Sequence, residues 1–525
     1  RKIMPLIKNF FLCLVCFTLS ACGDQSPQST NEEIASSEPR PVDVQSESDR
    51  EPSSVTGSAP GGAGNFKLSD HLGMDLLEQT RVGDLDMMEK ERVIRVLTVY
   101  GLGRYFLDGA EEKGPTYEIF KMFEKFINKR LGKGHLKVHV VFIPVSRDEL
   151  IPALVEGRGD IAAAGLTITD ERDQLIDFTT PVSKTISEIL VTGPSAPGIG
   201  TIEDLAGQKV YVRASSSYRS SLDGLNRQFL EAGKKKIQLQ DANEMLEDED
   251  ILEMVNAGLI DWAVVDDYKA RNWKIVFNNI KLRDDIVFRR DGRIAWAVRE
   301  DSPKLKSTLD EFLKSHRQGT LTGNILFNRY FRDFNWAKNA LEADNYKRFE
   351  DLQDIFQKYG DQYGFDYLMV AAQGYQESRL DQSARNKSCA IGVMQILPST
   401  ASDKNVGIPD ITKADPNIHA GIKYLDFIRK RYFADPEIDQ FNKTLFAFAS
   451  YNAGPARIHK LRDMAANAGY DPNVWFDQVE VFAAREIGRE TVQYVANILK
   501  YYIAYSLSAE QEMRRQKARQ QSGVG

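Results

Sequence analysis

The chain has 525 residues, of which 42% are hydrophobic and 27% are charged, and its formal net charge at pH 7 is -7. This length predicts about three domains. The negative charge, without any basic stripe, excludes nucleic acid as an expected partner. Beyond the N-terminus, no apolar run reaches the roughly 18 residues that a membrane-spanning helix needs.

The N-terminal segment has the pattern of an export signal. Basic residues precede an apolar run at 10–19 that ends in small residues, and this order is typical of a signal peptide over 1–22. Residues 19–22 (LSAC) resemble the bacterial lipobox, in which the cysteine, here Cys22, carries lipid; a plain cleaved signal is the alternative. Because Gly23 rather than aspartate follows, the resemblance implies a lipid anchor at the periplasmic face of the outer membrane.

A low-complexity stretch separates this signal from the folded part. Residues 23–65 are rich in Ser, Pro, Glu and Gly with almost no aromatic residues, which predicts a disordered tether. Residues 66–91 have an amphipathic helical pattern and form an expected helical extension. Cys389 is the one cysteine left beyond Cys22, so no intramolecular disulfide is expected, and we interpret it as a small apolar residue rather than a free thiol.

Strand and helix patterns alternate between residues 92 and 335. Helical periodicity at 116–131 and 150–156 is interleaved with apolar strand patterns at 93–99, 137–143, 160–164, 209–212, 262–265 and 294–298. This alternation predicts parallel sheets. In open α/β sheets, ligands bind beyond the carboxyl ends of the strands, where this chain has polar residues.

Residues 160–181 and 204–210 resemble the periplasmic solute-binding proteins for amino acids, over roughly 92–333. The resemblance implies a two-lobed α/β fold in which Arg172 binds a ligand carboxylate, assisted by backbone amides near Thr167 and Ser216. A surface salt bridge for Arg172 and a helix N-cap for Ser216 are the alternatives. The implied ammonium clamp and aromatic cover are each open between two residues: Asp266 or Asp267, and Tyr100 or Tyr105.

Strand signals vanish beyond about residue 331, and 346–506 reads as successive helices. We expect an all-α domain over 336–510 and a polar tail over 511–525. Asp366 is a candidate N-cap for a helix that runs to about Glu377. A carboxyl group at the negative end of a helix dipole, with apolar neighbours, should have a raised pKa, as a glycosidic general acid requires.

Four blocks in this helical region resemble the lysozyme-like domain of the soluble-lytic-transglycosylase family: 377–380 (ESRL), 392–401 (GVMQILPSTA), 449–454 (ASYNAG) and 490–495 (ETVQYV). One departure is Cys389, which stands where that family usually has glycine. A solute-binding domain followed by such a lysozyme-like domain resembles the membrane-bound lytic murein transglycosylase F family.

That resemblance implies a peptidoglycan lytic transglycosylase that needs no cofactor or metal. Glu377 would protonate the bridging oxygen between N-acetylmuramic acid and N-acetylglucosamine, and then accept the proton of the muramic C6 hydroxyl as a 1,6-anhydro ring closes. Asp381 is interpreted as a loop residue rather than a second catalytic acid. The residues implied to bind or shape the glycan are Ser378, Gln395, Tyr451, Asn452 and Tyr494; core packing is the alternative for Gln395, Asn452 and Tyr494.

Two other functions remain open from the sequence. A hydrolytic lysozyme would use water in place of the C6 hydroxyl, and a non-enzymatic amino-acid-type receptor would use the helical part only as a scaffold. For the α/β domain we expect either a sensor of a muropeptide or amino acid, coupled to cleavage at Glu377, or a docking platform without a ligand.

Overall fold

The computed structural model describes residues 79–108, 111–332 and 344–523, all within one compact unit, Ala63–Gly525. The expected signal peptide with Cys22 and the expected tether lie outside the described residues. So does most of the expected helical extension, whose described part contains α2 (Leu85–Glu91). Within the described ranges, no helix combines the length and apolar composition that crossing a bilayer requires.

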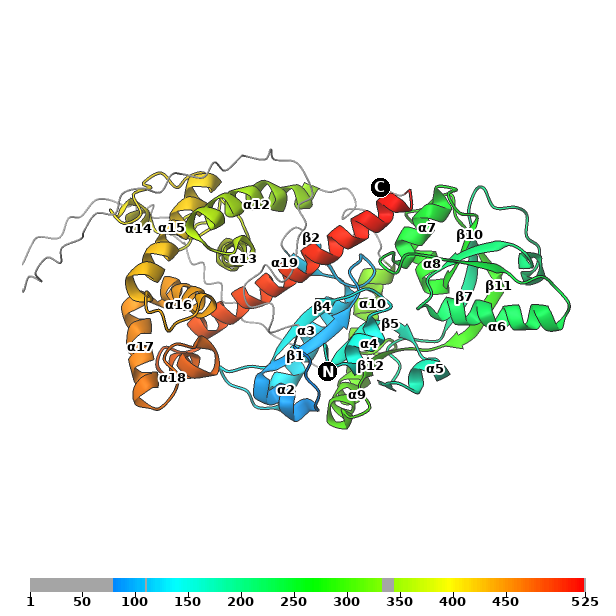
Figure 1. Ribbon diagram of the computed structural model, residues 1–525, viewed down its shortest axis with the longest axis horizontal. Coiled ribbons are helices and arrows are strands. Elements are labelled where there is room, and N and C mark those ends of the chain that lie inside the picture. Colours follow the sequence, from blue (N-terminus) through cyan, green and yellow to red (C-terminus); the bar gives the residue numbers. More distant parts are fainter. Residues whose placement is uncertain (1–78, 109–110, 333–343, 524–525) are drawn as a thin grey trace, which may run out of the picture. The chain divides into compact units, whose positions relative to one another are not determined.

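The first lobe of the α/β domain is built on a five-stranded sheet with the strand order β4-β1-β5-β12-β6; β1, β4, β5 and β12 are labelled in Figure 1. Strand β1 is parallel to β4 and β5, whereas β12 is antiparallel to β5 and β6. The expectation of parallel sheets is thus confirmed for three strands and wrong for β12, which returns directly from the second lobe without a crossover helix. The elements of this lobe are β1 (Val93–Thr98), β2 (Phe106–Asp108), β3 (Glu111–Lys113), α3 (Pro115–Arg130), β4 (His139–Pro144), α4 (Leu150–Val155), β5 (Ile161–Thr167), α5 (Asp170–Asp173), β6 (Asp177–Phe178), β12 (Ile294–Val298), α9 (Pro303–His316) and α10 (Leu321–Phe327).

The second lobe contains an antiparallel sheet of order β10-β7-β11 and a parallel pair, β8 with β9. The expectation of parallel sheets is therefore also wrong for β10, and it holds in this lobe only for the β8–β9 pair. The chain enters this lobe between β6 and β7 and leaves it between β11 and β12, so two segments connect the lobes. This gives the two-lobed solute-binding architecture expected from the sequence. Its elements are β7 (Ile186–Thr192), η2 (Ile202–Leu205), β8 (Lys209–Val212), α6 (Ser217–Glu231), β9 (Gln238–Asp241), α7 (Asp248–Asn256), β10 (Trp262–Asp266), α8 (Asp267–Trp273) and β11 (Lys281–Gly292).

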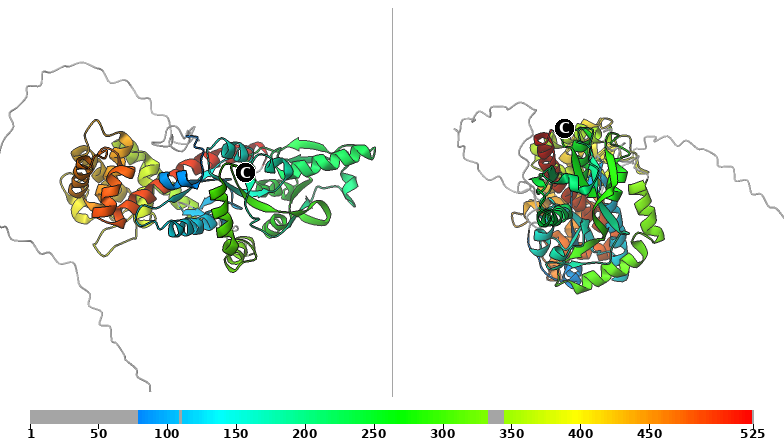
Figure 2. Two further views of the ribbon diagram at one scale, coloured as in Figure 1. Left: turned by 90° about the horizontal axis from the view of Figure 1, so that it is seen from below. Right: turned by 90° about the vertical axis from the view of Figure 1, so that its right-hand side faces the viewer.

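The described residues from 344 onward are helical, as the yellow to red ribbons in Figures 1 and 2 show. Their core includes the fully buried rings of Trp475, Phe446 and Phe433, and their amphipathic helices follow from the apolar spacing in the sequence. This all-α domain is formed by α12 (Asp344–Tyr363), α13 (Tyr367–Ser378), α14 (Pro398–Ser402), α15 (Ala414–Tyr432), α16 (Gln440–Ala453), α17 (Pro455–Asn467), η4 (Trp475–Val479), α18 (Glu480–Glu486) and α19 (Arg489–Gln521), and η3 (Asn328–Arg332) precedes it.

Helix α19 joins the two domains. It packs against α13 and α16 in the all-α domain and then along β4 of the first lobe. Lys500 pairs with Glu124 of α3 at 2.7 Å, and Arg515 lies 3.1 Å from Asp250 of α7 in the second lobe. Residues 511–521 of the expected polar tail continue helix α19, and two of their basic residues, Arg515 and Arg519, pair with Asp250 of the second lobe.

Candidate functional site

Glu377 lies in the last turn of α13. Asp366 caps the start of this helix, where its side chain accepts the N–H of Leu368 at 2.9 Å, which confirms the predicted N-cap. The helix is buried from Leu368 to Tyr375, and Arg379 follows its end at φ 57°. The carboxyl group of Glu377 therefore lies at the negative end of the helix dipole, at the edge of an apolar core.

A hydrogen bond ties Glu377 to α19. The hydroxyl of Tyr494 donates to Oε1 of Glu377 at 2.5 Å. Burial raises the pKa of Glu377 to about 7, and the hydrogen bond from Tyr494 acts in the opposite direction. The predicted rise in pKa is confirmed, and no second carboxylate contributes to it among the described residues. A carboxyl group that keeps its proton near neutral pH can serve as a general acid.

Gln373 is a polar residue of the site that no sequence motif indicated. It lies one helical turn before Glu377 on α13, its side chain is fully buried, and its Nε2 donates to the hydroxyl oxygen of Tyr494 at 3.0 Å. The only available sequence signal was a glutamine four residues before Glu377 in an otherwise apolar helix, since positions i and i+4 share a helix face.

The turn around Gly392 is held by two amide side chains. Asn417 is fully buried, accepts the N–H of Met394 at 2.8 Å and donates to the carbonyl of Ile391 at 2.8 Å. Gly392 has a φ of 74°, and a Cβ there would lie 2.5 Å from Gln382 and 2.7 Å from Asn417. Glycine is thus required at this position, and the turn is fixed relative to α13 and α15.

Two of the expected sugar-binding residues connect this turn to Glu377. The Tyr451 hydroxyl donates to the carbonyl of Met394 at 2.8 Å. Burial and the neighbouring Glu377 raise the pKa of Tyr451 well above its usual value. The Ser378 hydroxyl donates to the carbonyl of Val393 at 2.8 Å. Both residues thus position the turn beside the acid.

The remaining two candidates for glycan binding, Gln395 and Asn452, make no described hydrogen bond to Glu377. Nε2 of Gln395 donates to the carbonyls of Gly392 at 2.9 Å and Ala384 at 3.2 Å. Asn452 is exposed, and its Oδ1 accepts the hydroxyl of Thr491 at 2.7 Å. Their described hydrogen bonds are made within the surrounding loops and to α19, and none involves Glu377.

Cys389 is exposed and forms no disulfide within the described residues, so burial in an apolar core does not account for the small apolar residue expected at this position. Its φ of 64° places it in the left-handed region, which costs a residue other than glycine about 1–2 kcal/mol. This explains why glycine suits the position in the family that the sequence resembles.

Arg172, which was expected to bind a ligand carboxylate, is hydrogen-bonded to backbone carbonyls of the chain itself. Arg172 donates to the carbonyls of Thr167 and Ser215, each at 2.9 Å. Burial, followed by the nearby Arg147, lowers the pKa of Arg172 to about 10. Ser216 accepts the N–H of Arg219 at 3.3 Å as the N-cap of α6, which confirms the alternative interpretation of that residue.

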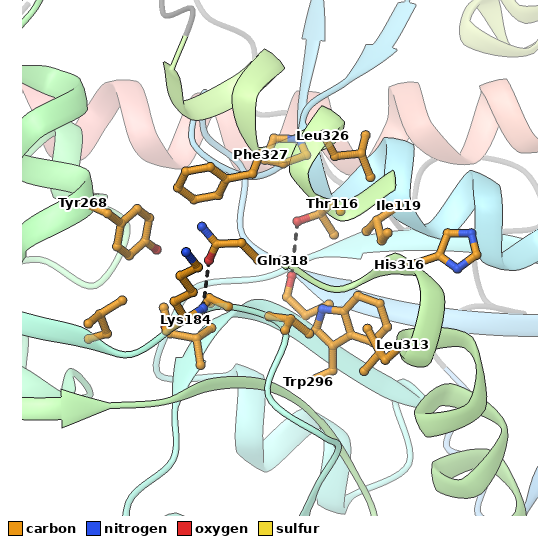
Figure 3. Close-up of a pocket in the computed structure, with 18 of the residues that line it drawn as sticks. Thr116, Ile119, Lys184, Tyr268, Trp296, Leu313, His316, Gln318, Leu326 and Phe327 are labelled. Atoms are coloured by element: carbon orange, nitrogen blue, oxygen red, sulfur yellow. Dashed lines mark hydrogen bonds between the residues drawn. The ribbon is translucent and has the colours of Figure 1, made fainter. Parts of the chain in front are cut away.

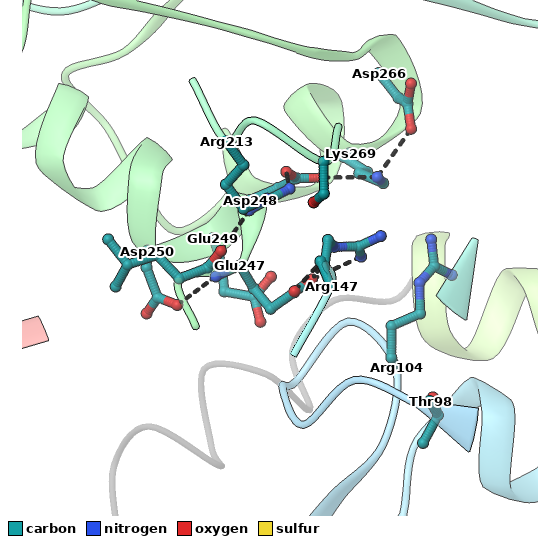
Figure 4. A network of polar contacts seen from close by, with 12 residues as sticks. Thr98, Arg104, Arg147, Arg213, Glu247, Asp248, Glu249, Asp250, Asp266 and Lys269 are labelled. Atoms are coloured by element: carbon teal, nitrogen blue, oxygen red, sulfur yellow. Dashed lines mark hydrogen bonds and ion pairs between the residues drawn. The ribbon is translucent and has the colours of Figure 1, made fainter. Parts of the chain in front are cut away.

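The expected ammonium clamp is occupied by a lysine (Figure 4). Nζ of Lys269 lies 2.9 Å from Asp266 and 2.6 Å from Asp248. Asp267, the other candidate, accepts the N–H of Tyr268 at 2.9 Å. A cavity of about 20 Å³ remains beside Arg172, Asp266 and Lys269. Tyr100 is not among the residues that line it.

An ion pair joins the two lobes next to this clamp. Arg147 follows β4 in the first lobe, and its Nη2 lies 2.7 Å from Oε2 of Glu247 in the second lobe, with both side chains buried (Figure 4). Neighbouring Arg213 lies 2.5 Å from Asp248. The Arg147–Glu247 pair thus connects the lobes through charges of the chain itself.

A larger cavity lies near the segments that connect the lobes (Figure 3). Its volume is about 320 Å³, and apolar or aromatic residues such as Trp296, Leu326 and Phe327 line it together with Arg104 and Lys184. Arg104 donates to the hydroxyl of Tyr268 at 2.8 Å. A mostly apolar lining with a few polar and charged groups is typical of small-molecule sites. In the part of the chain that the structure describes, no group of three or more His, Cys, Asp or Glu residues could hold a metal ion.

Comparison with known proteins accounts for both domains. Residues 108–333 match the family of bacterial extracellular solute-binding proteins, family 3, and residues 354–473 match the transglycosylase SLT domain. A membrane-bound lytic murein transglycosylase F from Desulfosudis oleivorans is 30% identical over 427 residues, covering 78% of this chain and 89% of the relative. The chain belongs to the membrane-bound lytic murein transglycosylase F family.

Other members of the transglycosylase F family match over a similar span. One from Pseudomonas putida is 28% identical over 444 residues, which cover 80% of this chain and 86% of that protein. Among solved structures, the substrate-binding protein of an amino acid ABC transporter matches 46% of this chain and 100% of its own, with 21% identity and a TM-score of 0.38. Tyr494 lies beyond the matched SLT range, on α19.

Proposed function

We propose that this chain is a peptidoglycan lytic transglycosylase in which Glu377 acts first as acid and then as base. The observation that carries the proposal is the buried carboxyl group of Glu377, whose pKa is raised to about 7, within a matched SLT domain. Protonated Glu377 gives its proton to the bridging oxygen between the muramic C1 and N-acetylglucosamine. The C1–O bond breaks, and the N-acetylglucosamine end leaves as an alcohol.

Glu377, now ionised, accepts the proton of the muramic C6 hydroxyl while that oxygen bonds to C1. The products are a 1,6-anhydromuramic end and a free N-acetylglucosamine end, and Glu377 regains its proton without consuming water. Glycosidases that use water generally need a second carboxylate. No carboxylate is among the causes of the raised pKa of Glu377; the matched transglycosylase SLT domain and the relatives named lytic murein transglycosylase F support the lytic reaction over a hydrolytic lysozyme.

The mass of the products tests this reaction. Purified peptidoglycan digested with the full chain should release 1,6-anhydro-muropeptides. Products heavier by one water would instead establish a hydrolytic lysozyme. An absence of products, with and without added muropeptides, would support the receptor function.

We infer that the other residues near Glu377 have two roles: some contact the glycan or shape its site, and others position the turn around Gly392. Exposed Asn452 and Gln395 contact the glycan, while Tyr494 shapes the site next to the acid. Ser378 and Tyr451 act by holding the turn around Gly392, because their hydroxyls already donate to its carbonyls.

For the α/β domain we propose a sensor of a muropeptide that changes the activity at Glu377. Ligand entry would compete with Lys269 for Asp266, would use Arg172 for a carboxylate, and would extend toward the 320 Å³ cavity. Helix α19 supports the coupling, because it carries both Tyr494, bound to Glu377, and Arg515, bound to Asp250 of the second lobe. Two sites that bias one shared element are what allostery requires.

Binding of a disaccharide-tetrapeptide to the full chain, measured by calorimetry, tests the sensor. We expect saturable binding that Arg172→Gln weakens at least about tenfold, since a charged hydrogen bond contributes roughly 1.5–3 kcal/mol. Free amino acids should bind more weakly, because they too must displace Lys269 from Asp266 but gain fewer contacts in return than a disaccharide-tetrapeptide. An absence of binding would leave a docking platform as the function of this domain.

We further propose that the protein is anchored by lipid on Cys22 at the periplasmic face of the outer membrane. The lipobox-like residues 19–22 and the membrane-bound designation of the relatives support this. The full chain expressed in a Gram-negative host should partition into the outer-membrane fraction, and Cys22→Ala should move it to the soluble fraction. A Cys22→Ala protein that stays in the membrane would refute the anchor.

A further inference from the structure

Gln373 occupies a place in α13 where an apolar side chain would be expected. Its neighbours in the helix, Met369, Val370 and Ala372, are all buried, and Gln373 itself has no exposed surface. A buried amide is costly unless its hydrogen bonds are made. Nε2 reaches Tyr494, but Oε1 has no partner in the described structure. Burial of the Gln373 amide thus costs desolvation free energy that an apolar side chain at this position would not.

The hydrogen bonds around Tyr494 run in one direction. Gln373 donates to the phenol oxygen at 3.0 Å, and the phenol O–H donates to Oε1 of Glu377 at 2.5 Å. Because the phenol has a single proton, an N–H directed at its oxygen leaves that proton free for Glu377. Successive hydrogen bonds also polarise one another, so the amide strengthens the phenol as a donor.

We propose that Gln373 is a positioning residue for glycosidic cleavage, whose amide orients the Tyr494 hydroxyl toward Glu377 and so controls the proton of the acid. This inference rests on the proposed role of Glu377. Gln373 is buried and touches no substrate; it acts through Tyr494.

The amide also suits both halves of the reaction. When Glu377 is ionised, the N–H of Gln373 supports Tyr494 as a donor to the carboxylate. When Glu377 is protonated and donates to the phenol oxygen, the phenol O–H needs an acceptor, and rotation of the amide presents Oε1. An apolar side chain offers neither group, and a carboxylate offers only the acceptor.

The test is the pH dependence of cleavage by Gln373→Met, which keeps the length of the side chain and removes both polar atoms. The hydrogen bond from Tyr494 lowers the pKa of Glu377, so weakening it should raise that pKa. Because Glu377 must be protonated to act, activity falls as pH rises through the pKa of Glu377. We expect this alkaline limb of the pH–activity profile to move to higher pH by about 0.5–1 unit. The kcat should fall by about tenfold or less, with KM unchanged.

A double-mutant cycle separates positioning from packing. Tyr494→Phe should move the limb in the same direction, and adding Gln373→Met to Tyr494→Phe should move it no further. Gln511→Met is the matched control, since Gln511 is also buried in a helix with an unpartnered Oε1 and should leave the limb in place. An unmoved limb in Gln373→Met, or additive shifts in the double variant, would overturn the proposal.

A second readout needs no activity. The pH dependence of unfolding, compared between each protein and its Glu377→Gln counterpart, reports the pKa of Glu377 in the folded state. Gln373→Met should raise that pKa in the full chain even if no cleavage is detected, which would distinguish failure of this inference from failure of the proposed reaction. The same pKa with and without Gln373 would contradict it.

Discussion

Replacing Glu377 by glutamine should reduce the formation of 1,6-anhydro-muropeptides by about 10²–10⁴-fold, the range that general acid–base catalysis contributes. The amide keeps the size of the side chain and can still contact Tyr494, but it can neither give a proton to the bridging oxygen nor accept one from the C6 hydroxyl. Mass spectrometry of digested peptidoglycan measures the loss. In the wild-type protein, activity should decline as pH rises through about 7, where Glu377 loses its proton.

Asp381→Asn is the matched control for this variant. Asp381 lies four residues beyond Glu377, and its Oδ1 accepts the N–H of Ser383 at 2.8 Å and the Ser383 hydroxyl at 2.6 Å, as in a loop. Its replacement should leave the products and the pH profile unchanged. If Asp381→Asn lost as much activity as Glu377→Gln, a mechanism with two carboxylates would follow, and the lytic assignment would fall.

Glu377→Gln should also stabilise the fold at higher pH. The pKa of Glu377 is about 7 in the folded chain and near 4.5 when unfolded, so between these values the folded state binds more protons. The wild-type free energy of unfolding therefore falls as pH rises from 4.5 to 7, by up to roughly 3 kcal/mol. Glu377→Gln lacks this loss, and its advantage in thermal unfolding should vanish below pH 4.5. An advantage independent of pH would contradict the buried acid.

Local features of the site followed from the sequence. The Asp366 cap and the raised pKa of Glu377 depend on residues within one helix, and helical periodicity with capping rules is sufficient to place them. The same rules gave an N-cap for Ser216 as the alternative to ligand binding, and the structure has this cap. These are properties of short stretches of chain.

The missed features all depend on contacts between distant parts of the chain. Nothing near Gln373 indicates that Tyr494, 121 residues away, supplies its partner. Arg515 looks like part of a polar tail until Asp250 is placed beside it. Lys269 has no sequence signal for occupying the Asp266 clamp, because its selection depends on how α8 packs in the second lobe. Propensity and periodicity describe a single element, whereas these interactions are set by tertiary packing.

The contact between the domains gives the second large expected effect. Arg92, directly before β1, donates to both carboxylate oxygens of Glu480 on α18, at 2.6 and 3.1 Å. The Glu480 side chain has no exposed surface, and that of Arg92 is 11% exposed. Arg92→Met should therefore leave a buried carboxylate without its cation and destabilise the chain by about 3–5 kcal/mol, seen as a lower midpoint in urea unfolding.

Removing the charge of Glu480 as well should recover much of the free energy of unfolding that Arg92→Met loses. The double variant Arg92→Met with Glu480→Gln removes both charges, so it should be more stable than Arg92→Met alone, whereas two unrelated sites would give additive losses. Arg271→Met is the matched control: its pair with Asp284 is 2.9 Å long but more than half exposed on both sides, and exposed pairs contribute about 0–1 kcal/mol. Equal losses for Arg92→Met and Arg271→Met would mean that burial of Glu480 does not hold the α/β domain on the catalytic domain. A larger loss for Arg92→Met, reversed by Glu480→Gln, would make this ion pair a principal attachment of the α/β domain to the helices that carry Glu377.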